Sequence, residues 1–334
     1  MTDAPSASTV ITGPTTWIVT DGRLGMINQC RGLAAALAVT AAEKKIDLAA
    51  PWRWLPPTLT PARLNVLSSK SDPLSPPWPE LLIGTGRKSV APALAVKRAS
   101  GGKTFCVQIQ NPDVALKKFD MVIAPDHDRL NGDNVFSTLG SLHGVTAVTL
   151  YQARAGFADA VADLPRPLIA ILLGGDNAVY RLDDGVAARL ADDLATLADV
   201  QGFGLAITAS PRTSPSAVAV IIQRLADALA SSKAVFWDNT GPNPYLGYLA
   251  HADAILVTCD SVNMVSEAAA TGKPVHVIEL TGGSDKFRRF HDAMTEAGIT
   301  RRFTGAIEQW SYTVPDDTAR AAAEIHRQLK LRAP

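Results

Sequence analysis

Short apolar runs alternate with longer amphipathic stretches along most of this chain, and the alternation occurs twice. In the first half, residues 16–20, 81–84, 104–110 and 121–124 have the length and composition of buried strands, and residues 27–39 and 88–99 have helical spacing. In the second half, strands are predicted at 168–173, 205–208, 234–237, 254–258 and 275–280, with helices near 184–200, 214–231, 244–251, 261–271 and 284–297. This alternation is typical of parallel strands joined by crossover helices.

The chain is too long for one ordinary core, so its 334 residues predict two domains of roughly 150 residues each. Pro165 and Pro167 favour an extended entry into the second series of strands. We therefore expect an α/β fold of two Rossmann-like domains, with parallel sheets facing a cleft. The first would cover residues 1–155 and bind an acceptor, and the second would cover 156–312 and bind a nucleotide. Residues 313–334 predict a helix, near 318–331, that packs back toward the first domain.

Composition narrows the function classes. Basic and acidic residues both number 32, so no global field favours nucleic acid, and no nucleic-acid partner is expected. Three scattered cysteines match neither a disulfide framework nor a zinc spacing, which suits a reducing cytoplasm. Residues 1–16 lack the pattern of a signal peptide, and no apolar stretch reaches the roughly 20 residues of a membrane-spanning helix. Any membrane contact would be peripheral.

The segment 51–79 is rich in Pro and Trp and predicts irregular surface structure. Its three tryptophans, Trp52, Trp54 and Trp78, could be exposed anchors for a protein partner or a membrane. The alternative is that they pack on their own domain, as single aromatic side chains commonly do.

Polar residues follow the strands of the second half, where helix amino termini can face an anion. Paired glycines after the first of these strands resemble an anion-cradling turn, although such a turn also occurs without a ligand. The hydroxyls and the guanidinium that follow the next strand, at 205–208, suit phosphate oxygens, although Ser and Thr there could simply cap a helix. A helix starting at Ser261 would put Glu267 on the same face as Asn263, placed for ribose hydroxyls, and a Glu on a solvated face is the alternative. The predicted nucleotide-binding residues are Gly174, Gly175, Asn177, Ser210, Arg212, Thr213, Asp260, Ser261, Asn263, Met264 and Glu267.

The first half has matching loops for an acceptor. Residues 84–89 contain Gly, Lys and Ser but fail the phosphate-loop pattern, because Arg87 separates Gly86 from the lysine. A helix start with Arg87 and Ser89 could still hold an anion, and a solvated basic cap is the alternative. The predicted acceptor-side residues are Gly22, Arg23, Gly25, Asn28, Gln29, Gly86, Arg87, Ser89 and Gln110.

Three side chains are candidates for a general base. His127 stands between two carboxylates, and such neighbours can orient an imidazole and raise its pKa, although a surface network is the commoner arrangement. Asp21 and Asp126 lie in loops that follow strands. No metal site and no cofactor are expected.

Five segments together resemble the mitochondrial-fission elongated-mitochondria (ELM) family: residues 21–29, 84–89, 108–112, 124–130 and 260–267. Plant members of that family are implicated in recruiting a dynamin-related protein to mitochondria. The second half is also similar, more distantly, to the donor-binding domain of two-domain (GT-B type) glycosyltransferases, such as the enzyme that adds N-acetylglucosamine to a peptidoglycan lipid precursor. That resemblance implies phosphate contacts for Gly174, Gly175 and Ser210, and a ribose contact for Glu267. The sequence departs from the glycosyltransferase pattern at two places. Pro211 stands where a second basic residue is expected, and residues 21–29 contain no His.

Three hypotheses follow. The first is a metal-independent glycosyltransferase that binds a nucleotide or nucleotide-sugar in an inter-domain cleft. The second is a non-catalytic scaffold or peripheral membrane adaptor that presents its surface to a protein partner. The third is a nucleotide-sugar epimerase that uses a dinucleotide, and the absence of both the spaced glycine fingerprint and a Tyr-x-x-x-Lys pair disfavours it.

Overall fold

The computed structural model describes residues 13–332 of the chain. Residues 1–12 carry most of the segment for which the sequence predicts no signal peptide, so that prediction lies outside the described residues. The chain folds into two compact units, each with its own buried apolar core. Within the described residues, the first unit holds 13–124, 130–137 and 318–332, and the second holds 125–129 and 138–317.

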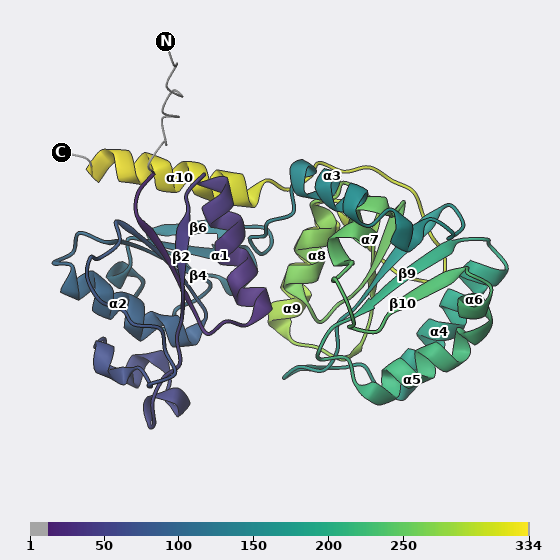
Figure 1. Cartoon of the computed structure of the whole chain (residues 1–334), viewed down its shortest axis with the longest axis horizontal. Coiled ribbons are helices and arrows are strands. Elements are labelled where there is room, and N and C mark those ends of the chain that lie inside the picture. The colour runs from purple at the N-terminus through teal and green to yellow at the C-terminus, as the bar shows by residue number, and fades with distance from the viewer. Residues whose placement is uncertain (1–12, 333–334) are drawn as a thin grey trace, which may run out of the picture. The chain divides into compact units, whose positions relative to one another are not determined.

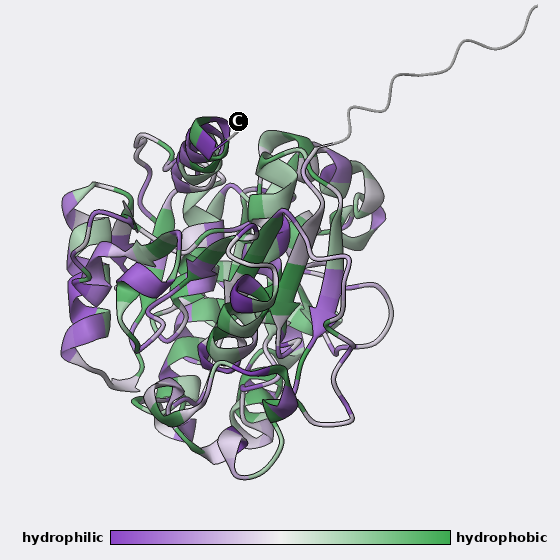
Figure 2. Cartoon of the chain, turned by 90° about the vertical axis from the view of Figure 1, so that its left-hand side faces the viewer, coloured by the Kyte–Doolittle hydropathy of each residue, from purple (hydrophilic) through white to green (hydrophobic). Residues whose placement is uncertain are grey.

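The first unit is built on a six-stranded sheet in the order β2-β1-β3-β4-β5-β6. Its strands from β2 to β5 run parallel, because each is joined to the next by a crossover. The central strands are apolar and buried, as the green interior in Figure 2 shows. The strands are β1 (Thr16–Thr20), β2 (Ala41–Lys45), β3 (Leu81–Thr85), β4 (Phe105–Ile109), β5 (Met121–Pro125) and β6 (Val135–Thr138), and the helices are α1 (Leu24–Ala36), α2 (Val90–Ala99) and α10 (Asp317–Arg332).

The second unit repeats this plan with a parallel sheet in the order β10-β9-β7-β11-β12-β14. Helices α4, α5 and α6 cover one face, where Leu190 and Ile221 are buried, and α7, α8 and α9 cover the other, where Val265 and Phe290 are buried (Figure 1). The strands are β7 (Leu168–Leu173), β8 (Tyr180–Arg181), β9 (Gly204–Ala209), β10 (Ala234–Trp237), β11 (Ala254–Thr258), β12 (Val275–Ile278), β13 (Thr281–Gly282) and β14 (Thr300–Arg302). The helices are α3 (Ala147–Gly156), α4 (Asp184–Asp199), α5 (Pro215–Arg224), α6 (Ala226–Ala230), α7 (Tyr245–His251), α8 (Val262–Ala269) and α9 (Asp285–Glu296).

The chain enters the second unit at Thr138, earlier than the boundary at residue 155 that the sequence predicts. The reason is α3, which lies beside α7 on the second unit (Figure 1). Arg154 Nη1 donates to the carbonyl of Ala250 at 3.2 Å, and the ring of His251 bonds back to the Arg154 carbonyl. Helix α10 belongs to the first unit, where Arg332 pairs with Asp120.

The α/β class and the two parallel sheets are confirmed, and every strand predicted from an apolar run is present. The sequence missed β2, β6 and β14, which are edge strands with polar or charged residues, and the two-residue strands β8 and β13. It also missed α3, which has no buried residue within it. The cause is shared, because hydrophobic periodicity marks only those elements that bury a face.

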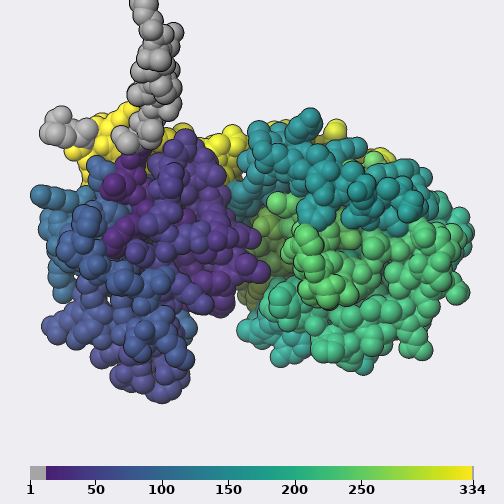
Figure 3. Space-filling model, viewed as in Figure 1, coloured from purple at the N-terminus to yellow at the C-terminus, as the bar shows by residue number. Residues whose placement is uncertain are grey.

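The Pro- and Trp-rich segment is irregular as predicted, with three short 3₁₀ turns at Trp52–Trp54, Pro57–Leu59 and Leu64–Val66. In Figure 3 this indigo segment forms the lower end of the first unit. Trp54 is 69% exposed, which fits the expectation of an anchor. Trp52 and Trp78 correct that expectation, since both are half-buried, and the ring of Trp78 packs edge-on against Trp17 at 6.1 Å.

Candidate functional site

Three of the predicted loops meet at one edge of the second sheet. Strand β7 lies between β9 and β11, so the residues after Leu173, Ala209 and Thr258 follow neighbouring parallel strands. Ligands of open parallel sheets gather at this carboxyl edge. The nucleotide-side residues predicted from the sequence are thus brought together within one unit.

Asp260 ties these three loops to one another. Its side chain is fully buried, and its carboxylate accepts hydrogen bonds from Thr258 Oγ1 at 2.6 Å and from the Gly175 amide at 3.1 Å. Arg212, from the loop after β9, forms an ion pair with it at 2.7 Å. A buried carboxylate is tolerated only when it is paired and hydrogen-bonded, and these three contacts meet that requirement. Asp260 therefore positions Arg212, whose side chain stays 40% exposed.

The paired glycines have a different role from the one the sequence indicates. The Gly174 amide donates to Thr258 Oγ1 at 2.7 Å and the Gly175 amide donates to Asp260, so both donors are used within the protein. A Cβ at Gly174 would overlap the Asp260 carboxylate, and one at Gly175 would overlap the backbone of Arg212. The glycines thus allow the three loops to close on one another. Asn177 likewise supports the turn, donating from Nδ2 to the Asp260 carbonyl at 3.2 Å.

The loop after β9 presents the hydroxyls that the sequence singled out. Ser210 Oγ accepts from the Arg212 amide at 3.2 Å and lies 3.3 Å from Thr213 Oγ1. Thr213 in turn donates to the carbonyl of Gly174, which fixes this loop against the one after β7. Ser214, the next residue, caps α5 by accepting from the Ala217 amide. Capping thus falls to Ser214, and Ser210 and Thr213 stand at the loop junction.

Helix α8 starts where the sequence predicts, with Ser261 as its amino-terminal cap accepting from the Met264 amide at 3.3 Å. Glu267 lies one turn beyond Asn263. Tyr245 of α7 donates from its hydroxyl to Glu267 Oε2 at 2.6 Å. Burial raises the pKa of Glu267 to about 7, and the Tyr245 hydrogen bond opposes that rise. Glu267 as a residue is half-buried, and a carboxylate that accepts one phenol hydroxyl keeps capacity for further hydroxyl donors.

The predicted acceptor-side loops follow β1 and β3, which are neighbours in the first sheet. Asp21 forms an ion pair with Arg23 at 2.9 Å, and the two loops touch where Thr85 Oγ1 donates to the sulfur of Met26. Gly22 and Gly86 both adopt positive φ, near 79° and 78°, which a side chain would strain. The exposed members of the predicted set are Arg23, Gly25, Asn28 and Arg87.

Three other predicted acceptor-side residues have structural partners. Gln29 is buried, and its Nε2 donates to the Gly25 carbonyl at 3.0 Å. Ser89 is buried too, and its hydroxyl donates to the Gly86 carbonyl at 2.9 Å. Gln110 takes a positive φ of 71° at the end of β4, and its amide donates to the carbonyl of Ile123. These bonds shape the loops.

His127 is buried with 6% of its surface exposed, and its ring packs edge-on against Phe290 at 5.3 Å. Burial lowers the pKa of His127 to about 4, and the nearby Asp128 carboxylate offsets this only in part. Asp128 is itself paired with Lys286 at 2.5 Å. A ring that is neutral and enclosed is a weak and inaccessible base, so this geometry argues against catalysis by His127. Asp126, beside it, is exposed.

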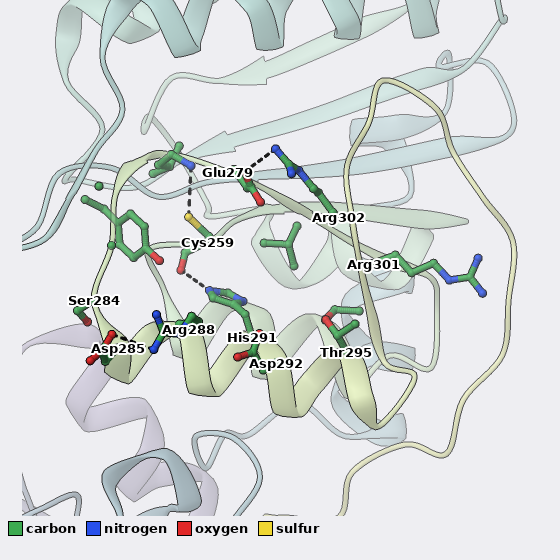
Figure 4. A pocket seen from close by; sticks show the side chains of 16 residues that line it. Cys259, Glu279, Ser284, Asp285, Arg288, His291, Asp292, Thr295, Arg301 and Arg302 are labelled. Carbon is green, nitrogen blue, oxygen red and sulfur yellow. Dashed lines mark hydrogen bonds and ion pairs between the residues drawn. The ribbon is translucent and has the colours of Figure 1, made fainter.

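A pocket of about 620 Å³ that the sequence did not indicate lies between α9 and the β12–β14 edge of the second sheet (Figure 4). Glu279 pairs with Arg302 at 2.6 Å on its sheet side, and Asp285, Arg288 and Asp292 line it from α9. The sequence held one signal, the i, i+3 and i+7 spacing of these polar residues on α9. That signal could not be placed, because the opposite wall depends on the unpredicted strand β14.

Metal-binding clusters and membrane-spanning helices are both lacking from the part of the chain that the structure describes. Across residues 13–332 no group of three or more His, Cys, Asp or Glu side chains is arranged to hold a metal ion. In the same range, every helix is too short or too polar to cross a membrane.

Two units with parallel α/β sheets, and loops clustered at a carboxyl edge, are the features of the GT-B fold. Solved structures of similar fold superpose on this chain. A UDP-GlcNAc 2-epimerase from Methanocaldococcus jannaschii, described in complex with UDP-GlcNAc and UDP, superposes with a TM-score of 0.55 at 12% identity, covering 95% of this chain and 99% of that one. A glycosyltransferase from Rickettsia africae ESF-5 gives a TM-score of 0.51 at 9% identity, with coverage of 96% and 99%.

The chain belongs to the mitochondrial fission ELM1 family, whose sequence model matches residues 24–329. It is 34% identical to the mitochondrial fission protein ELM1 of Arabidopsis thaliana, over 76% of this chain, and that match spans 65% of the plant protein. It is 27% identical to an uncharacterized protein of Rickettsia prowazekii (strain Madrid E), over 94% of this chain and 98% of that one. The family resemblance predicted from the five loop segments is confirmed.

Proposed function

We propose that the second unit binds the diphosphate and ribose of a nucleotide-sugar at the carboxyl edge of its sheet. The observation that carries this proposal is the Arg212–Asp260 pair, in which a buried carboxylate holds a half-exposed guanidinium among three loops. Guanidinium groups bind phosphate oxygens through two parallel hydrogen bonds. The fold adds support, since structural neighbours include a protein described with UDP-GlcNAc and UDP.

The phosphates would contact Arg212, the hydroxyls of Ser210 and Thr213, and the amino end of α8. Asp260 would repel a phosphate if it were exposed, but its side chain is buried and its charge is matched by Arg212. The positive end of a helix dipole adds favourable potential near Ser261. The proposal thus assigns Gly174 and Gly175 to shaping the site and Arg212 to contacting the ligand.

The ribose would bind at Glu267. Ribose hydroxyls are donors, and a carboxylate is an acceptor with capacity for several hydrogen bonds. Tyr245 already donates to one of its oxygens at 2.6 Å and orients it. Because the pKa of Glu267 is raised to about 7, ribose donors would favour the ionised acceptor and lower that pKa on binding.

The reaction proposed for this site is metal-independent glycosyl transfer to an acceptor held by the first unit. The acceptor hydroxyl would lose its proton to a carboxylate, for which Asp21 and Asp126 are the remaining candidates. Epimerisation of the nucleotide-sugar is the alternative that the fold favours equally, because UDP-GlcNAc 2-epimerases share it. The products distinguish the two: transfer releases a free nucleoside diphosphate, and epimerisation leaves the nucleotide-sugar intact with an inverted centre.

Calorimetric titration of the full chain with UDP, GDP, ADP and their sugars tests the binding proposal. We expect one nucleotide to bind, and Arg212→Ala and Glu267→Ala each to weaken its affinity about tenfold or more, as loss of a charge-assisted hydrogen bond predicts. Arg224→Ala is the matched control, since Arg224 lies in a surface ion pair on α5. The proposal is contradicted if no nucleotide binds wild type, or if both variants bind the nucleotide with the affinity of wild type.

A second candidate function is a scaffold that contacts a protein partner or a membrane surface peripherally. One observation favours it: Trp54 is 69% exposed, with the Arg53 guanidinium 5.2 Å from its ring centroid. Exposed aromatic side chains next to cations are common in interface anchors. Sedimentation with anionic and neutral vesicles, and recovery of proteins from lysate, should both fall with Trp54→Ala. Unchanged recovery in both assays counts against the scaffold.

A further inference from the structure

The pocket between α9 and the edge of the second sheet is walled by polar side chains, and most of the charged ones are matched in pairs. Glu279 and Arg302 form an ion pair at 2.6 Å, and Arg288 and Asp285 form another at 3.0 Å. Asp292 lines the same space and has no ion pair within residues 13–332. The pocket therefore offers no excess of positive charge for an anion, and a second phosphate site is unfavourable there.

The same walls offer hydrogen-bond donors and acceptors side by side. Ser284 and Thr295 bring hydroxyls from the two ends of α9, and the carboxylates of Glu279 and Asp292 are acceptors (Figure 4). Val277 and Leu280 supply apolar surface. A volume of about 620 Å³ lies within the range of small-molecule sites, about 300–1,000 Å³. A ligand that suits this surface carries many hydroxyls, each of which both donates and accepts.

His291 fixes the inner wall. Its Nε2 lies 2.8 Å from the carbonyl of Cys259, so that nitrogen carries the proton, and burial lowers the pKa of the ring. The ring is thus neutral and anchored to the turn between β11 and α8. Arg301 contributes little to the pocket, because it pairs with Glu308 and its guanidinium lies over Trp310 at 4.5 Å. The groups that face a ligand therefore come from α9 and from the Glu279–Arg302 pair.

We infer that this pocket is a separate binding site for a polyhydroxylated ligand, a sugar ring or similar polyol, recognised by Asp292, Glu279 and the hydroxyls at the ends of α9. Every lining residue belongs to the second unit, and none belongs to the set assigned above to the nucleotide. The inference therefore does not depend on the proposed nucleotide site.

Saturation-transfer NMR on the full chain tests this site, with glucose, galactose, mannose, N-acetylglucosamine and myo-inositol as probes and inorganic phosphate as the anionic comparison. We expect at least one polyol to bind in the millimolar range. Asp292→Asn should weaken that binding roughly tenfold, because it removes a charged acceptor. Thr295→Trp should abolish it by filling the pocket from an exposed helix position.

Two controls separate this site from the other proposal and from misfolding. Glu296→Gln changes an exposed acid on α9 that does not line the pocket, and it should bind the polyol as wild type does. Thr295→Trp should retain whatever nucleotide affinity wild type has. The inference is overturned if no polyol binds wild type, if binding survives Thr295→Trp, or if phosphate binds in the polyols' place.

Discussion

Replacement of Asp260 by alanine is the sharpest test of how the second unit holds its loops. The change removes a fully buried carboxylate that accepts hydrogen bonds from Thr258 and from the Gly175 amide, and pairs with Arg212. Each hydrogen bond to a charged group contributes about 1.5–3 kcal/mol. The ion pair with a 40% exposed guanidinium adds about 1 kcal/mol at most, because solvent screens it.

Together these contacts predict a loss of about 4 kcal/mol, within the range for removing one partner of a buried pair. For a domain of 150–250 residues, 1 kcal/mol corresponds to about 2–4 °C in melting temperature, so we expect the second unit to melt about 8–16 °C lower. Differential scanning calorimetry measures this directly. Urea unfolding gives the free energy independently.

Two further variants make the result interpretable. Asp192→Ala removes the acid of an exposed ion pair with Arg224, and it should change stability by less than about 0.5 kcal/mol. Asp260→Asn keeps the shape and one acceptor oxygen of the side chain. Its loss of stability should therefore lie between those of Asp192→Ala and Asp260→Ala. If Asp260→Ala melts within about 2 °C of wild type, the three loops are not held together by this carboxylate and the reasoning fails.

Other predictions concern single residues of the second unit. Gly175→Ala should lower the free energy of unfolding in urea by about 2–4 kcal/mol, because its Cβ would overlap the backbone of Arg212. Gly156→Ala is the control and should change stability little, since a Cβ there meets nothing within 4 Å. Equal effects of the two changes would contradict this prediction. The folded pKa of Glu267, near 7, lies above the unfolded value, so ionisation destabilises the wild-type fold as pH rises from 5 to 8. Glu267→Gln cannot ionise, and its free energy of unfolding relative to wild type should therefore rise by about 2 kcal/mol over that range. A difference that does not change with pH would refute this. Asp317→Ala should cost about 2 kcal/mol, because its carboxylate accepts from two backbone amides at 2.8 and 3.2 Å, and an unshifted thermal transition would count against it.

The sequence located the core of the fold because buried parallel strands need unbroken apolar runs. Strands β7 and β11 each consist of apolar or buried residues throughout, and their predicted bounds match the structure. The helices between them carried a 3.6-residue period that followed from packing on a sheet. Edge strands such as β2, with Glu43 and Lys45 toward solvent, bury too little surface to leave that pattern.

For the candidate site too, the sequence predicted the positions of the residues but not their contacts. Position after a strand end made Arg212 and Asp260 candidates, and helical spacing from Asn263 made Glu267 one, since carboxyl-edge loops are fixed by topology. What each residue does there depended on contacts across the chain. Asp260 reaches loops 48 and 85 residues away in sequence, to Arg212 and Gly175, and no local pattern reveals that a carboxylate will be buried between them.

By itself, the sequence determined that this chain forms two parallel α/β sheets, that it belongs with the ELM family, and that polar loops follow its strands. Only the tertiary structure decided that the amides of the paired glycines bond within the protein, that His127 is buried, and that a polar pocket forms against β14. The physical reason is that secondary structure follows from local spacing. Burial, pKa and cavity shape follow from residues that meet only when distant segments pack.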